Sequence, residues 1–257
     1  MSEGRAIGRK DGGVGWLTFS HPERHNALGE AMCAKAVAIL EDFAADPGVR
    51  LCVLTGDGDK AFISGADIGG FSERAGRTAG ERPSIARLFD ALSDFEKPMI
   101  AAIRGWCLGG GLAVAMKADL RICSADARFG IPAARLGVGY PTDSMRDLVA
   151  LVGPSAAKRI LFIGDRLTAE HALRIGLADE VVEGAELEGR IGELARTIGE
   201  NAPLSLRAAK ASIDHITRGS PSAETVDALV AQCFGSADFA EGRAAFLEKR
   251  PPAFRGE

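Results

Sequence analysis

The order of apolar and polar positions predicts a chain that alternates strands and helices over its first 185 residues. The run Leu51–Leu54, which is closed by Thr55 and Gly56, is typical of a strand buried on both faces of a parallel sheet. Short apolar runs predict further strands at Val14–Phe19, Met99–Ile103, Leu120–Cys123, Arg128–Ile131 and Val181–Val182. An α/β fold is the class that such alternation indicates.

Apolar residues recur at helical spacing between these runs. One stripe predicts a helix over residues 29–45, and Ile85, Leu88, Phe89 and Leu92 predict the next. Further helices are expected over 109–117, 142–152 and 169–176. Residues 69–82 are rich in glycine and charge, so we expect a mobile loop there.

The strand signal stops after about residue 185. Leu187, Ile191, Leu194 and Ile198 mark one helix, and three more helical stretches follow to about Lys249. Helices outside the α/β repeat need another surface to cover their apolar faces. The pattern therefore predicts a core over residues 1–185 and a helical region over residues 186–257, whose helices either build an oligomer or fold back on their own core.

Composition narrows the class of protein. The chain has 257 residues, of which 46% are hydrophobic and 26% charged, as in a soluble globular protein. A net charge of −4 without a dense basic block argues against nucleic acid as a partner. No apolar run reaches the roughly 20 residues that cross a bilayer, and the polar start carries no signal-peptide pattern. We expect a cytoplasmic protein without a membrane partner. The five scattered cysteines show no metal-ligand spacing, so we expect reduced thiols and no metal site.

Two segments of small residues carry the candidate chemistry. Ser64-Gly65-Ala66 and Gly109-Gly110-Gly111 each follow a short apolar run that predicts a strand. Small side chains let a ligand approach the backbone N–H closely, and Gly110 is expected at a helix N-terminus. Two N–H groups aimed at one point form an oxyanion hole, which stabilises negative charge developing on a carbonyl oxygen.

The flanking motifs identify a family resemblance. Several segments occur in the order found in enoyl-CoA hydratases and isomerases: HPERHNAL (21–28), AFISGADI (61–68), IRGWCLGGGLAVAMKADLRI (103–122), RFGIPAARLGVGYP (128–141) and TAEHALRIGLADEVV (168–182). The chain resembles this crotonase superfamily over nearly its whole length. The resemblance implies a crotonase-like ββα spiral core, an acyl-CoA substrate and no cofactor beyond the coenzyme A of that substrate. It also implies a homotrimer or a dimer of trimers built by the C-terminal helices.

The resemblance also assigns roles to residues. In this family the N–H groups at the positions of Ala66 and Gly110 bind the thioester oxygen. The substrate-binding residues that it implies are Arg24, Ala27, Leu28, Ala66, Asp67, Ile68, Gly109, Gly110 and Lys249.

The acid/base residues of the hydratases are missing. The two glutamates that hydratases usually carry correspond to Ala113 and Ala133, and alanine cannot transfer a proton. Tyr140, the only tyrosine, and Asp143 are the candidates to replace them. The segment around Tyr140 and the C-terminal EGRAAFLEKRPPAF (241–254) resemble methylmalonyl-CoA decarboxylases, although Ala66 stands where those enzymes have histidine. Alternatively, Tyr140 is a packing residue and Asp143 a helix-favouring acid.

Three functions therefore stay open. The first is a lyase on a CoA thioester, either a hydratase or a decarboxylase. The second is an isomerase or hydrolase on the same scaffold, with Asp143 or Glu73 as its acid/base group. The third is a non-catalytic CoA-binding oligomer, which the loss of both glutamates favours.

Overall fold

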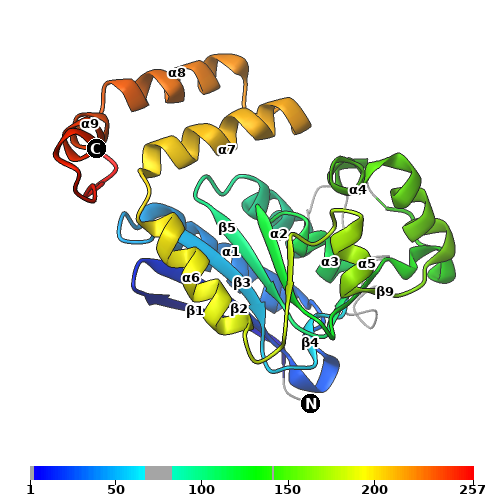
Figure 1. The fold of residues 1–257 in the computed structure, drawn as a ribbon. Helices are drawn as coiled ribbons and strands as arrows, with labels where there is room; N and C mark the ends of the chain where they lie inside the picture. Colours follow the sequence, from blue (N-terminus) through cyan, green and yellow to red (C-terminus); the bar gives the residue numbers. More distant parts are fainter. Residues whose placement is uncertain (1–2, 67–82, 141) are drawn as a thin grey trace.

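The computed structural model describes residues 3–66, 83–140 and 142–257, and within these ranges the strands form two sheets (Figure 1). The larger sheet has the order β1-β2-β3-β5-β7-β10, with all neighbours parallel except β1 and β2. Its strands are β1 (Arg5–Asp11), β2 (Val14–Ser20), β3 (Leu51–Gly56), β5 (Met99–Ile103), β7 (Leu120–Ser124) and β10 (Glu180–Val182).

The smaller sheet has the order β4-β6-β8-β9. Its strands are β4 (Ala61–Ile63), β6 (Trp106–Leu108), β8 (Arg128–Gly130) and β9 (Leu167–Thr168). Strands β4, β6 and β8 are parallel, so the segments that follow them leave the same edge of the sheet. This edge carries both predicted small-residue segments.

Helices cover both faces of the larger sheet. The core helices are α1 (Glu30–Ala45), α2 (Ser84–Ser93), α3 (Gly110–Ala115), α4 (Thr142–Ile163), α5 (Ala169–Arg174) and α6 (Leu187–Gly199). Cys52 and Leu54 pack in the cluster that contains α1 and α2, while Leu51 and Val53 pack against α6. Alternate residues of a strand point to opposite faces, so both faces of β3 are buried, as predicted.

The α/β prediction is confirmed, and the structure adds two strands that the pattern missed. In β1 only Ala6 is buried, so a period-2 apolar signal is absent. The strand pairs with β2 through a turn in which Gly12 and Gly13 have φ of 55° and 84°. Charged side chains suit such an edge strand, because they discourage pairing with another chain. Strand β9 has two residues and is too short for any periodicity.

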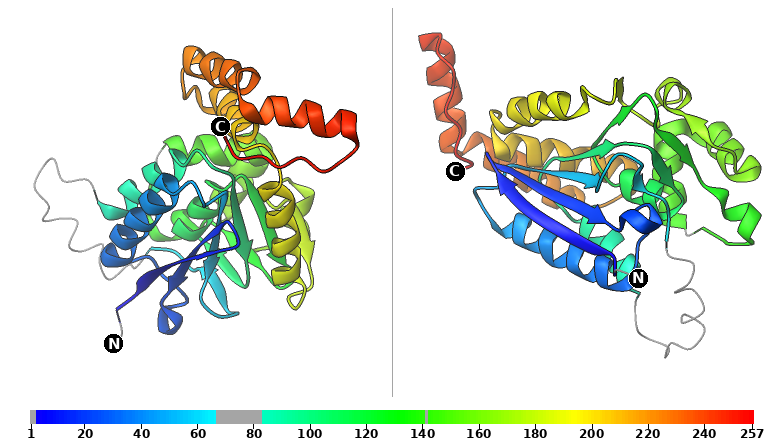
Figure 2. Two further views of the ribbon diagram at one scale, coloured as in Figure 1. Left: turned by 90° about the vertical axis from the view of Figure 1, so that its left-hand side faces the viewer. Right: turned by 90° about the horizontal axis from the view of Figure 1, so that it is seen from below.

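The C-terminal helices divide into two groups. Helix α6 buries Leu187, Ile191 and Ala195 on the larger sheet of its own chain, so it needs no partner subunit for these residues. Helices α7 (Pro203–Arg218), α8 (Ala223–Phe234) and α9 (Ala237–Glu248) project from the core as an arm, here defined as residues 203–257 (Figures 1 and 2). The predicted boundary at residue 185 remains a prediction. None of the described helices has the length and apolar character that a membrane span requires.

Candidate active site

The two small-residue segments lie in backbone contact. A Cβ atom on Gly110 would lie 3.4 Å from the amide nitrogen of Ala66, and one on Gly111 would lie 2.1 Å from the carbonyl oxygen of Ile63. Glycine is therefore needed at position 111 for helix α3 to pack on the end of β4. This packing brings Gly110 beside Ala66, which is the pairing that the sequence predicted.

Among the described residues, neither the Ala66 N–H nor the Gly110 N–H donates a hydrogen bond to another backbone group. The carbonyl of Gly65 accepts from Leu28 N at 2.8 Å, and a trans peptide directs the next N–H, that of Ala66, away from Leu28. Gly110 is the first residue of α3, so its N–H has no acceptor within the helix. The neighbouring Gly109 N–H is occupied, because it donates to Gly130 O at 2.8 Å.

A buried asparagine positions the loop beside this site. The Asn26 side chain accepts from His21 N at 2.8 Å and donates to Ala61 O at 2.8 Å and to Asp57 O at 3.0 Å. These bonds tie the loop that carries Ala27 and Leu28 to the start of β4. Sequence reasoning missed this role. The sequence did hold a signal for it, which is an asparagine just before a predicted helix. Asparagine is one of the few residues that adopt a left-handed backbone readily, and Asn26 does so with φ of 58°.

Three predicted residues lie near the Ala66 and Gly110 N–H groups and differ in exposure. Ala27 and Leu28 are buried, and the Leu28 side chain comes within 3.7 Å of the Gly110 Cβ position. Arg24 is exposed on a short 3₁₀ helix (Pro22–Arg24), and its carbonyl accepts from Ser64 Oγ at 3.1 Å. Asp67, Ile68, Glu73 and the predicted loop at 69–82 lie outside the described residues.

Tyr140 reaches the glycine segment. Its hydroxyl lies 3.8 Å from the Cβ position of Gly109, and the ring packs against the core beneath. Burial, with a smaller contribution from Cys107, raises the pKa of Tyr140 to about 12. The hydroxyl therefore keeps its proton at neutral pH, so it can donate a hydrogen bond or a proton and does not act as a base.

The two alanines and Asp143 occupy contrasting surroundings. Ala113 on α3 and Ala133 on the 3₁₀ helix Pro132–Leu136 are both buried. The Asp143 side chain is 82% exposed, and its Oδ1 lies 3.6 Å from the guanidinium of Arg146. Asp143 thus lies at the surface of α4, where its catalytic role stays a prediction.

Lys249 lies far from the Ala66 and Gly110 N–H groups of its own chain. It forms the C-terminal cap of α9, which stands at the far end of the arm, well apart from α3 in the core (Figure 1). The structure therefore brings together Leu28, Ala66, Gly109, Gly110 and Tyr140. It leaves Lys249 of the same chain apart. Within the described ranges no group of three His, Cys, Asp or Glu side chains could hold a metal ion.

A spiral α/β core with two inward N–H groups on adjacent glycine-rich turns defines a crotonase-type fold. Comparisons with known proteins agree. The family model described as enoyl-CoA hydratase/isomerase matches residues 9–257. The chain is 35% identical to a short-chain-enoyl-CoA hydratase of Clostridium acetobutylicum, covering 97% of each protein. It is also 35% identical to a crotonyl-CoA hydratase of Syntrophomonas wolfei, covering 93% of each.

A solved structure extends the likeness to the fold. The enoyl-CoA hydratase/carnithine racemase of Magnetospirillum magneticum superimposes with a TM-score of 0.90 at 30% identity, covering 100% of this chain and 97% of that one. The chain belongs to the enoyl-CoA hydratase/isomerase family, within the crotonase superfamily.

Proposed function

We propose that this chain is a lyase that acts on an acyl-CoA thioester through an enolate. The observation that carries the proposal is the contact between Gly110 and the Ala66 nitrogen, with the Tyr140 hydroxyl next to Gly109. In this proposal the N–H groups of Ala66 and Gly110 bind the thioester oxygen. They hold it more tightly as it gains negative charge, which is the requirement for catalysis.

Tyr140 supplies the proton in this proposal. Polarising the thioester stabilises the α-carbanion as an enolate, which must then regain one proton. The protonated Tyr140 hydroxyl fits that task, since its raised pKa keeps the proton in place until a strong base such as an enolate forms. Water then returns the proton to the tyrosinate.

Hydration by two carboxylates does not fit this chain, because Ala113 and Ala133 stand at those positions. Decarboxylation is the second candidate, and the same two alanines favour it. Breaking the bond between the α-carbon and a carboxylate leaves its electron pair in the thioester enolate and releases carbon dioxide. No base is needed, and the single returned proton can come from Tyr140.

The proposal includes the assembly. Five large apolar side chains of the arm are exposed in the single chain, to between 60% and 84%: Ile213, Ile216, Phe234, Phe246 and Leu247. Large exposed apolar side chains in this number favour a surface that another protein covers. We propose a homotrimer or a dimer of trimers in the cytoplasm, with coenzyme A entering only as part of the substrate.

Product analysis tests the reaction. The purified protein is incubated separately with crotonyl-CoA, a medium-chain enoyl-CoA and methylmalonyl-CoA, and the products are followed by mass. Loss of carbon dioxide from methylmalonyl-CoA would support decarboxylation, and gain of water by an enoyl-CoA would support hydration with other residues positioning the water. Binding of all three without turnover would refute the lyase and favour a CoA-binding oligomer.

A further inference from the structure

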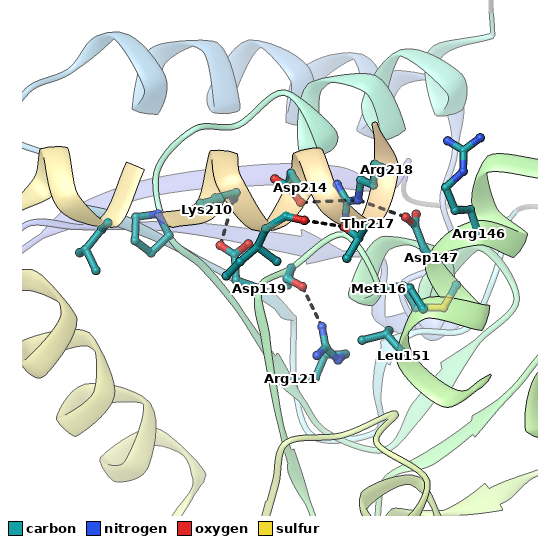
Figure 3. Close-up of a pocket in the computed structure, with 15 residues that line it drawn as sticks. Met116, Asp119, Arg121, Arg146, Asp147, Leu151, Lys210, Asp214, Thr217 and Arg218 are labelled. Carbon is teal, nitrogen blue, oxygen red and sulfur yellow. Dashed lines mark hydrogen bonds and ion pairs between the residues drawn. The ribbon is translucent and has the colours of Figure 1, made fainter. Parts of the chain in front are cut away.

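Ion pairs tie the arm to the core, beside the apolar Leu206 and Ile213 of α7, which line the cavity between the two. In α7 only Ala208 is buried, while Lys210, Asp214 and Arg218 recur every fourth residue and face the core (Figure 3). These side chains line the same cavity, which has a volume of about 350 Å³. The apolar Ile213 and Ile216 are instead 60% and 80% exposed.

One carboxylate in this layer joins three elements. Asp147 on α4 has a side chain only 4% exposed, and its Oδ2 lies 2.7 Å from Lys117 Nζ. Its Oδ1 lies 3.3 Å from Nε of Arg218, which belongs to the arm. Within the part of the chain that the structure describes, Asp147 is the only carboxylate paired with Lys117. The other three basic groups that line the cavity have their own partners: Arg121 pairs with Asp179, Arg146 with Asp143 and Lys210 with Asp119.

Lys117 lies two residues past the end of α3, the helix that begins at Gly110. Its N–H donates to Val114 O at 3.0 Å. A helix rises about 1.5 Å per residue, so its six residues span roughly 9 Å. A displacement of the Lys117 end is therefore transmitted to Gly110 by a short rigid element. The Lys117 side chain is 9% exposed, and a buried cation must keep a counter-charge.

We propose that Asp147 is a positioning residue for the oxyanion hole, which anchors α3 through Lys117 and couples it to the arm through Arg218. This inference rests on the proposed function of the Ala66 and Gly110 N–H groups. It predicts that removing the Asp147 charge disturbs the alignment of the Gly110 N–H with a bound thioester. Transition-state binding suffers more than ground-state binding in that case.

The test uses butyryl-CoA labelled with ¹³C at its carbonyl, whose infrared band shifts to lower frequency when an oxyanion hole polarises it. In Asp147→Asn we expect most of that shift to disappear, and kcat on the substrate found by product analysis to fall about tenfold to a hundredfold with KM nearly unchanged. A misplacement of about 1 Å can cost about 10²-fold in rate. Arg218→Met removes the arm's contact with Asp147 but keeps the Lys117–Asp147 pair. This variant should therefore lose only part of the infrared shift of the bound carbonyl.

Arg207→Met is the matched control. Its pair with Glu96, at 2.7 Å, also ties α7 to the core but lies after α2, away from α3, so this variant should keep the full shift. If Asp147→Asn fails to fold, the double variant Lys117→Met/Asp147→Leu removes both charges at similar volume and serves instead. A wild-type shift in either Asp147 variant overturns the inference. Absence of a shift in the wild type would overturn the oxyanion hole itself, and the inference with it.

Discussion

Gly110→Ala separates binding of the thioester oxygen from folding. The added methyl would lie 3.4 Å from Ala66 N, with its next neighbours 3.7 Å away, so it meets ordinary contacts rather than a clash. A bound oxygen must lie about 2.7–3.1 Å from the donors, in the space beside Ala66 N that the methyl takes. Loss of one oxyanion donor typically costs about 10²–10³ in kcat, or about 2.7–4 kcal/mol, so we expect at least a hundredfold loss of turnover.

The stability of Gly110→Ala, unlike its turnover, should not fall below that of the wild type. Alanine is favoured over glycine in helices by about 0.5–1 kcal/mol, so the melting temperature of Gly110→Ala should stay the same or rise by a few degrees. Gly111→Ala is the comparison, because its methyl would lie 2.1 Å from Ile63 O. Overpacking costs about 1–3 kcal/mol, which lowers the melting temperature by roughly 2–4 °C per kcal/mol in a protein of this size.

The assay combines thermal unfolding, turnover and the ¹³C carbonyl band of bound butyryl-CoA. Gly110→Ala should unfold normally, lose turnover and show no polarised carbonyl. If it turns substrate over within about threefold of wild type, the oxygen is bound elsewhere, since a missing donor should cost about 10² or more.

Three further outcomes follow from the same geometry. Tyr140→Phe should lower turnover at least about tenfold while acyl-CoA affinity stays nearly constant, because general acid catalysis is worth about 10²–10⁴; an equal rate would make Tyr140 a packing residue. Since burial raises the pKa of Tyr140 to about 12, its proton should stay on and turnover should hold a plateau to about pH 10; an alkaline loss near pH 9 that Tyr140→Phe lacks would contradict this. Phe246→Asp, at a side chain 84% exposed in α9, should yield a lighter species in light scattering, and an unchanged mass would show that this part of the arm is no interface.

Local signals explain what the sequence could predict. The Thr168 side chain accepts from His171 N at 3.2 Å at the start of α5, as a threonine before an apolar helix indicates. The continuous apolar run of β3 likewise predicts a strand that is buried on both faces. Such features depend on residues within a few positions of one another, so a pattern along the chain contains them.

Contacts between distant segments explain the rest. Nothing near Asp147 in the sequence indicates that it pairs with both Lys117 and Arg218, because the three residues belong to three helices or their ends. The place of Tyr140 beside Gly109 likewise depends on how the segment after β8 folds back. Family resemblance made Tyr140 a candidate. The distance of its hydroxyl from Gly109 and its raised pKa depend on the folded structure and could not be predicted from the sequence.

Among the described residues, the loss of both carboxylates limits the routes to an enolate that this site can take. Removing an α-proton requires a base near the thioester, and neither Ala113 nor Ala133 can be one. The Tyr140 hydroxyl cannot replace them at neutral pH, because it holds its own proton up to a pKa of about 12. Asp143 is mostly in solvent, beside Arg146. An enolate formed by expulsion of carbon dioxide needs no base, only the two N–H groups to hold its oxygen and one acid to return a proton. The described part of the site contains both, which is why decarboxylation is to be assayed beside hydration.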